Sequence, residues 1–240
     1  MNNFLSFIIK KEEGLNFSKI SGDKNKIHID NLIGYNSIFG STICHGVLVI
    51  FKFFKIINIE KKIKEKEKFS IDIEFKKHIV YDAPITIKSL HKSYDFFYHL
   101  LQKKEVVAII NITDDYKENT TKIERITKSK KITPNKKFNN FYKKLKMNPT
   151  LGMILSNLSR YVGTIYPGKN SIIKKINIEF NSFNNDNQKS IFFTSKLIDK
   201  RLPIIINRLK YNNYVVNFET LIRPKLDVIV PPSKAPTDVI

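Results

Sequence analysis

The chain has 240 residues, 42% of them apolar and 12% aromatic, so it can bury one large core or two smaller ones. Its net charge of +20 would suit a nucleic-acid partner, but the basic residues are almost all lysines spread along the chain. Nucleic-acid binders favour the arginine fork, so we expect no nucleic-acid role. No apolar run approaches the 18 or so residues of a transmembrane helix, so we expect no membrane insertion.

The cysteine content and the N-terminus favour a cytoplasmic protein. A single cysteine excludes an internal disulfide and suits a reducing compartment. Residues 1–14 have no basic leader before their short apolar stretch and no small-residue cleavage site, so we expect no signal peptide.

The first half of the chain predicts one helix surrounded by strands. Residues 1–16 predict an opening strand and turn, and residues 17–43 an irregular segment punctuated by glycines. Residues 44–62 crowd apolar side chains on all sides, which is typical of a buried helix. Strands are predicted at residues 69–78, 84–91, 96–102 and 105–113. This pattern alone indicates an α+β fold with an antiparallel sheet.

The second half repeats this order after a polar, lysine-rich stretch, residues 116–137, which predicts an exposed linker. An apolar helix begins near residue 150, and its run 156–161 is typical of a helix face at a contact between the two halves. Strands follow at residues 170–180, 189–199, 203–211 and 214–222. We therefore predict domains over residues 1–115 and 138–227, and a proline-rich, extended tail over residues 228–240.

The most informative stretch is residues 21–30, SGDKNKIHID. It places the Asp23 carboxylate, the Asn25 amide and the His28 imidazole within six residues, and Gly22 permits a sharp turn. A carboxylate and an imidazole can hold one water molecule from two sides, one accepting a proton while the other donates one. An Asx turn followed by a surface histidine would give the same pair at this spacing.

The whole string resembles the signature S-G-D-x-N-P-[apolar]-H-x-D of the MaoC-like dehydratases and (R)-specific enoyl-CoA hydratases. Lys26 stands where that family has proline, which loosens the turn. Residues 44–48, CHGVL, resemble the His-Gly pair that opens the family's helix, and residues 69–87 resemble its next strand. The matching positions are Ser21, Gly22, Asp23, Asn25, Ile27, His28 and Asp30.

The resemblance implies an α+β double hotdog fold, in which two tandem repeats each wrap a curved antiparallel sheet around a central helix. The second half lacks the motif and has no histidine beyond His99. It is implied to be a degenerate repeat that completes the sheet and walls the acyl pocket. The chain would then be an intramolecular pseudo-dimer, with further homodimerisation left open.

The implied activity is that of a hydro-lyase of fatty acid metabolism, an (R)-specific 2-enoyl-thioester hydratase or 3-hydroxyacyl-thioester dehydratase. Asp23 would help to deprotonate the water that attacks C3, and His28 would assist proton delivery to C2. The substrate would be an acyl-CoA or an acyl-carrier-protein thioester, whose phosphopantetheine arm belongs to the substrate. No cofactor is implied.

Three further residues form the candidate substrate-binding set. Asn25 would orient the water or the histidine, or else cap an Asx turn. The Gly46 N–H, at the first turn of the buried helix, would bind the thioester oxygen, or the glycine would serve close packing. Ser21 would border the site, with capping of the loop as its structural alternative.

Other chemistries are less well supported by the residues. Cys44 and His45 occupy adjacent helix positions about 100° apart, so they do not form a catalytic pair, and His45 is expected to be a packed, hydrogen-bonded residue. The remaining histidines lack ligand spacing, so no metal site is predicted. A hotdog thioesterase and a non-catalytic acyl-binding or accessory protein remain as alternatives, and Lys26 slightly favours the latter.

Overall fold

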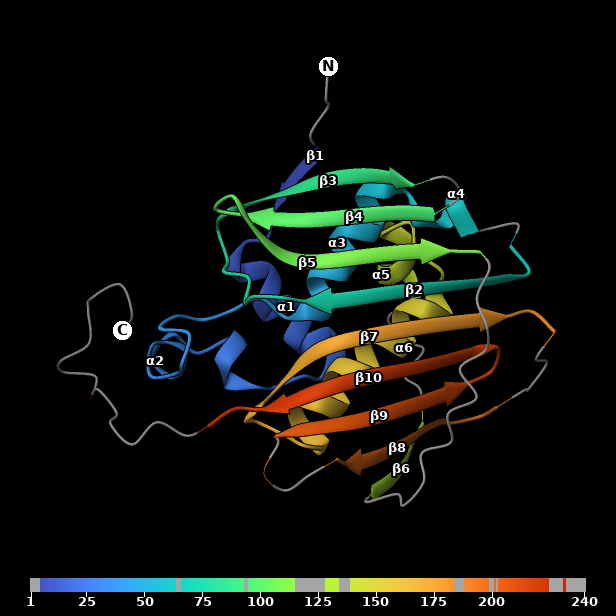
Figure 1. Ribbon diagram of the computed structural model, residues 1–240. Coiled ribbons are helices and arrows are strands. Elements are labelled where there is room, and N and C mark those ends of the chain that lie inside the picture. Colours follow the sequence, from blue (N-terminus) through green and yellow to red (C-terminus); the bar gives the residue numbers. More distant parts are fainter. Residues whose placement is uncertain are drawn as a thin grey trace.

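The computed structural model describes residues 5–63, 66–92, 95–114, 128–133, 139–183, 188–198, 201, 203–224 and 231. These residues form a ten-stranded antiparallel sheet in the order β1-β3-β4-β5-β2-β7-β10-β9-β8-β6, with helices packed against one face (Figure 1). Figure 1 shows α3, α5 and α6 behind the curved sheet. The helix-facing side therefore holds the core.

The described residues of the first half form five strands and four helices. The strands are β1 (Leu5–Ile8), β2 (Lys68–Phe75), β3 (Pro84–Lys92), β4 (Asp95–Gln102) and β5 (Glu105–Thr113). The helices are α1 (Lys11–Ser21), α2 (Asn31–Tyr35), α3 (Gly46–Ile57) and α4 (Ile59–Ile63), with a 3₁₀ turn at Lys26–His28.

The described residues of the second half form a second set of five strands. These are β6 (Lys128–Ile132), β7 (Ser171–Asn181), β8 (Ile191–Leu197), β9 (Ile204–Tyr211) and β10 (Tyr214–Ile222). The helices are α5 (Asn139–Lys144) and α6 (Pro149–Arg160), and α6 continues into a π-helical turn, Tyr161–Ile165.

The two halves have the same topology. From the outer edge to the centre, the first half runs β1-β3-β4-β5-β2 and the second runs β6-β8-β9-β10-β7, so each strand has a counterpart five places later. The innermost strands, β2 and β7, pair from Lys68↔Asn181 to Glu74↔Lys175 and make one continuous sheet. This arrangement confirms the predicted α+β double hotdog.

Each half is built around one apolar helix of 12 residues. Eight residues of α3 and nine of α6 are buried, and a helix that is apolar on most sides must be surrounded by other structure. The start of α6 is capped by Asn148, whose Oδ1 accepts the N–H groups of Thr150 and Leu151, with proline at the first helical position.

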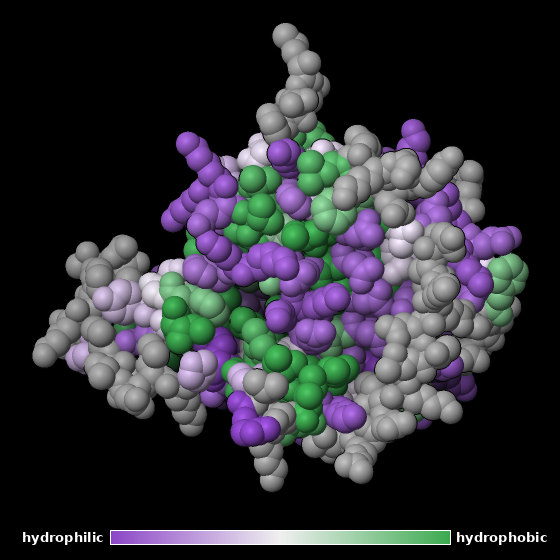
Figure 2. Space-filling view, viewed as in Figure 1, coloured by the Kyte–Doolittle hydropathy of each residue, from purple (hydrophilic) through white to green (hydrophobic). Residues whose placement is uncertain are grey.

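The outer face of the sheet is polar at its centre. The Asn177 side chain donates to Asp72 Oδ1 at 3.0 Å and to Ser70 Oγ at 3.1 Å, which ties β7 to β2. Asn217 of β10 donates to Asn177 Oδ1 at 3.3 Å. Figure 2 shows hydrophilic residues gathered over the middle of this face. Because side chains alternate along a strand, this polar row fixes which side faces the helices, where Ile71 is fully buried.

The beginning of the chain differs from the prediction. After β1 the chain forms α1, which extends into the segment predicted to be irregular. Gly14 and the polar residues obscure its helical periodicity, whereas local capping defines its ends. The Lys10 N–H donates to the Glu13 carboxylate at 3.0 Å, and Gly22 ends the helix in the left-handed conformation, with φ 78°.

The predicted linker, residues 116–137, contains β6, which pairs with β8 at the sheet edge. Four of its five residues are exposed, so the strand has no apolar alternation to reveal it. Of the predicted tail, residues 228–240, the structure describes only Pro231, and the extended conformation lies outside the described residues. The domain limits stay a prediction.

Within the part of the chain that the structure describes, no helix is both long and apolar enough to cross a membrane.

Truncating the core of α6 should destabilise the fold strongly. Leu155 is fully buried, so Leu155→Ala should lower the free energy of unfolding by about 2–5 kcal/mol through lost burial and a residual cavity. Leu15 of α1 is 39% exposed and provides a control on another helix, where Leu15→Ala should change it by less than about 0.5 kcal/mol. Chemical denaturation measures both; equal losses would contradict the placement of α6 in the core.

Candidate functional site

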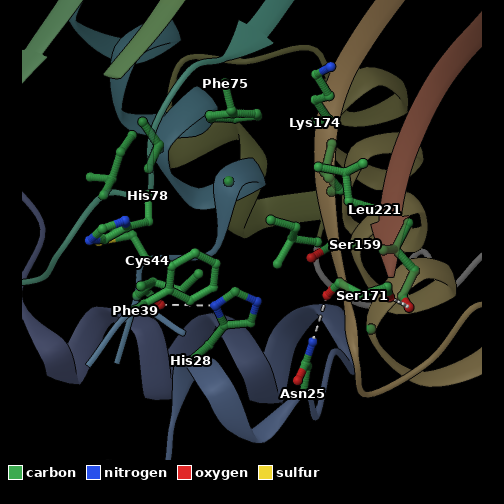
Figure 3. A pocket seen from close by; sticks show the side chains of 18 of the residues that line it. Asn25, His28, Phe39, Cys44, Phe75, His78, Ser159, Ser171, Lys174 and Leu221 are labelled. Carbon is green, nitrogen blue, oxygen red and sulfur yellow. Dashed lines mark hydrogen bonds between the residues drawn. The ribbon is translucent and has the colours of Figure 1, made fainter. Parts of the chain in front are cut away.

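A cavity of about 370 Å³ opens between the two repeats. Asp23, Asn25 and His28 lie on its wall. Ser159 and Ser171 of the second repeat also line it, and Figure 3 shows Asn25 bonded to Ser171. Much of the remaining lining is apolar, from Ile43, Val49, Phe75, Ile79, Val162, Ile172, Ile173 and Leu221. The motif therefore borders a largely apolar cavity to which both halves contribute.

Hydrogen bonds to the end of α1 give the motif loop its shape. Ser18 Oγ donates to the Asp23 carbonyl at 2.5 Å, and Ser21 Oγ accepts the Asp23 N–H at 3.1 Å while donating to the Phe17 carbonyl at 2.8 Å. Asn25 Oδ1 accepts the Ile27 N–H at 3.4 Å and caps the 3₁₀ turn that carries His28. Ser21 is thus a brace behind the loop and is not among the residues that line the cavity.

Two groups of the protein bind the Asp23 carboxyl. Its Oδ2 accepts a hydrogen bond from Ser159 Oγ at 2.7 Å, and its Oδ1 accepts the Asn25 N–H at 3.0 Å. A side chain at Gly163 would place Cβ only 2.0 Å from Oδ1, so only glycine fits against the carboxyl. Burial raises the pKa of Asp23, since charge is costly away from water, while His28 and the Ser159 hydrogen bond act in the opposite direction.

The His28 ring has one nitrogen fixed and one available. Its Nδ1 lies 2.9 Å from the Ile43 carbonyl, which can only accept, so Nδ1 carries the hydrogen. Nε2 of the neutral ring is then a proton acceptor. Burial lowers the pKa of His28, and the Asp23 carboxyl opposes that shift. The site thus pairs an acid that holds its proton more firmly with a base that stays neutral more readily.

A second imidazole lies behind His28. His45 is buried, its Nδ1 lies 3.2 Å from the Tyr81 hydroxyl, and its ring stacks on His28 with centroids 4.1 Å apart and planes 29° apart. One ligand-type atom each of Asp23, His28 and His45 lies within 4.8 Å of the others. An ion bound by imidazole lies close to the ring plane, about 2.0–2.1 Å from the nitrogen. Two rings stacked so nearly parallel do not suit an ion held by both.

The contacts of Asn25 are those of a structural bridge. Its Nδ2 donates to the Ser171 carbonyl of β7 at 3.1 Å, while its Oδ1 caps the turn, so both ends of the amide bind the protein.

Gly46 is the first residue of α3 and lines the cavity. A Cβ there would lie 2.9 Å from the end of the Phe75 ring, so a larger residue would have to displace that ring. The Gly46 N–H has no acceptor within the helix.

The sequence implied that the second repeat walls the pocket, but it did not identify which residues of that repeat contact the motif. Ser159 lay in the run predicted to contact the other half, but nothing marked it as a partner of Asp23. Gly163 follows it by four residues, one turn later, and only the folded chain reveals its contact with the carboxyl. Nothing in the sequence indicated that Tyr81 would contact His45.

Three lysines line the mouth of the cavity. Lys76 pairs with Glu74 at 2.6 Å and Lys77 with Glu105 at 2.7 Å, and both lie at the end of β2. Lys174 comes from β7 (Figure 3). The two lysines of the first repeat are therefore balanced by carboxylates, and the second repeat adds the positive charge of Lys174 to the lining.

No family model and no curated protein matches the sequence. Among solved structures, a MaoC-like dehydratase aligns over 93% of this chain and 97% of its own, with a TM-score of 0.58 and 9% identity. The chain has the fold of the MaoC-like dehydratases.

Two further structures with this fold align over nearly the whole chain. A MaoC-like dehydratase from Phytophthora capsici covers 93% of this chain and 96% of its own, with a TM-score of 0.52 and 7% identity. The dehydratase domain of a mycocerosic acid synthase-like polyketide synthase covers 93% and 92%, with a TM-score of 0.55 and 6% identity. The MaoC-like fold is established by these likenesses, and the reaction has to be argued from the site.

Replacing Asp23 by its neutral isostere should stabilise the protein at neutral and alkaline pH. Because burial raises the pKa of Asp23 in the folded state, ionising it costs stability as pH rises above its unperturbed value of 3.8. Asp23→Asn removes that cost. Its melting temperature should exceed that of the wild type at pH 8, by about 2–4 °C per kcal/mol recovered.

The gain should shrink as the pH falls toward 3.8, where the wild-type carboxyl is protonated in both folded and unfolded states. Thermal unfolding from pH 4 to 9 measures the trend. Asp114→Asn, at an exposed ion pair with Lys66, is the control and should change stability little. A variant that is less stable than wild type at pH 8 would show that the carboxylate is not buried at a cost.

Proposed function

We propose that the protein is a hydro-lyase that reversibly adds water to a 2-enoyl thioester, with (R)-3-hydroxyacyl thioesters as the other partner of the reaction. The observation that carries this proposal is the placement of the Asp23 carboxyl and the His28 imidazole on one wall of a largely apolar cavity. One atom of each lies within 4.8 Å of the other, so both can reach one small substrate group.

In the dehydration direction, each group has a role that its surroundings favour. His28 Nε2 takes the proton from C2 of the 3-hydroxyacyl thioester, while the Asp23 carboxyl donates its proton to the departing 3-hydroxyl, which leaves as water. The C2–H electron pair forms the new C2–C3 double bond. A buried acid with a raised pKa and a buried base with a lowered pKa fit these roles.

Hydration runs through the same steps in reverse. The Asp23 carboxylate accepts a proton from the water that attacks C3, and the His28 imidazolium delivers its proton to C2. The Gly46 N–H at the start of α3 would bind the thioester oxygen as negative charge gathers there, which is the role that a helix N-terminus suits. Asn25 would contribute by holding the loop that carries both reacting groups.

The cavity supports a thioester substrate. Its apolar walls would surround a short acyl segment and exclude bulk water from the reacting carbons. Lys174, which lines the cavity from β7, would attract the phosphates of coenzyme A or of a carrier-protein phosphopantetheine arm.

The test is turnover of crotonyl-CoA, followed as loss of the enone absorbance. Asp23→Asn and His28→Ala should each lower kcat/KM by at least about 10²-fold, because each removes a proton-transfer group. His99→Ala is the control: His99 lies on β4, half-buried, and is not among the residues that line the cavity. Chiral analysis of the 3-hydroxybutyryl product reports the stereochemistry.

Two outcomes would contradict the hydratase proposal. Release of free thiol without enone loss would indicate a thioesterase. Absence of turnover with CoA and carrier-protein substrates of several chain lengths would indicate an acyl-binding or accessory protein.

The hydrogen bond from Ser159 of the second repeat should affect proton transfer by the Asp23 carboxyl. Ser159→Ala leaves Oδ2 without its donor, so kcat should fall about tenfold while KM changes little, because the loss acts on proton transfer. Ser156→Ala is the matched control: Ser156 lies one turn earlier, is also buried, and accepts from Tyr142 instead. Equal effects of the two variants on kcat would indicate a general loss of helix packing.

A further inference from the structure

The stack of His45 on His28 is the part of the site to which the reaction assigns no role. Both rings are buried, and their centroids lie 4.1 Å apart. His45 is the N-cap residue of α3, yet its side chain makes no capping hydrogen bond. Its ring instead lies flat behind His28 and is not among the residues that line the cavity.

The His45 ring is held from several sides. Tyr81 contacts its Nδ1 at 3.2 Å, and Phe17 packs edge-on with centroids 5.0 Å apart. Its Nε2 is buried and has no hydrogen-bond partner among the described residues. The ring is thus fixed by packing and by one hydrogen bond.

The Tyr81 ring packs against α1, where Gly14 leaves room for its hydroxyl. A Cβ at Gly14 of α1 would lie 2.2 Å from the Tyr81 hydroxyl, so a side chain at that position would displace the tyrosine. Lys11 lies over the Tyr81 ring, 5.2 Å from its centroid, and donates to the His28 carbonyl at 3.2 Å. The face of α1 thus supports a row that runs from Tyr81 through His45 to His28.

The second imidazole stays neutral while the first one reacts. Burial holds the pKa of His45 well below its usual value, and the positive charges of His28 and Lys11 add to this effect, while the Asp23 backbone opposes it. His28 itself faces the Asp23 carboxyl, which favours its protonated form, and Lys11 and Arg223, which disfavour it. A cation within about 6 Å of the face of Trp, Tyr or Phe is attracted by the electrons of the ring, and the neutral His45 imidazole turns its face to His28 in the same way.

We propose that His45, held by Tyr81, is a positioning residue that orients the His28 ring and stabilises the imidazolium formed when His28 takes the C2 proton. This inference rests on the proposed function for its catalytic consequence, whereas the coupling of the two rings can be measured without turnover.

The experiment compares two substitutions of the same residue. His45→Leu removes the π face, whereas His45→Phe keeps an aromatic ring and loses only the hydrogen bond to Tyr81. Tyr81→Phe leaves the imidazole and removes its hydrogen-bond partner. His99→Leu, on β4, is the matched control for replacing a histidine by leucine away from the stack. Circular dichroism and thermal unfolding verify that each variant is folded.

The readouts are the pH titration of the His28 ring by ¹⁵N NMR and the kinetics of crotonyl-CoA hydration. We expect the His28 titration midpoint to fall in His45→Leu, because the imidazolium loses its stacked partner, and to return toward the wild type in His45→Phe. We expect kcat to fall about tenfold in His45→Leu with KM little changed, and to recover in large part in His45→Phe.

A His28 ring that titrates identically in the wild type and in His45→Leu would overturn the inference. So would equal losses of kcat in the leucine and phenylalanine variants, since these would show a packing role alone. If the wild type turns over no thioester, the proposed function fails, and the NMR titration still decides whether the two rings are coupled.

Discussion

The site depends on one contact across the two repeats: the Asp23 carboxyl is buried against the start of the second repeat's π-helical turn. Ser159 donates to one oxygen, and Gly163 leaves room for the other. The motif loop alone would leave this carboxyl facing solvent, where it would ionise like an ordinary surface aspartate. Its raised pKa therefore belongs to the assembled pair of repeats and not to the ten-residue motif.

The pairing of β2 with β7 and the hydrogen bonds of the motif loop hold the Asp23 carboxyl against the second repeat. The β2–β7 ladder fixes one repeat against the other over seven residue pairs, from Lys68↔Asn181 to Glu74↔Lys175. Thr164, inside the π-helical turn, donates to the Gly22 carbonyl and accepts the Lys24 N–H, both at 3.3 Å. These bonds restrain the loop in which Lys26 replaces the family's proline, so rigidity that proline would supply locally comes here from the other repeat.

The sequence allowed much of the fold to be predicted, because strands and apolar helices leave periodic patterns. The buried helix α3, the strands from β2 to β5 and those from β7 to β10 were all expected near their observed positions. Two elements escaped for physical reasons: α1 is defined by its caps more than by an apolar face, and β6 is an exposed edge strand rich in lysine.

For the site, the motif string pointed to Asp23 and His28, and the structure places both on one cavity. Ser159 is 136 residues away from Asp23 in the chain, and Tyr81 is 36 residues from His45. Residues so far apart in the chain can come into contact at any sequence separation, so a single sequence does not reveal such contacts. Whether a residue such as Asn25 faces a ligand or caps a turn is likewise decided by the folded backbone.

Joining the two repeats in one polypeptide has a consequence for how such a protein can change. In a symmetric homodimer every substitution appears twice, so a residue that suits one copy must be tolerated at the equivalent place in the other. Here Gly163 and Ser159 serve a carboxyl that only one half possesses, and the other half is free to lose its own reactive loop. Covalent linkage removes the symmetry constraint and allows one half to specialise as the partner of the other.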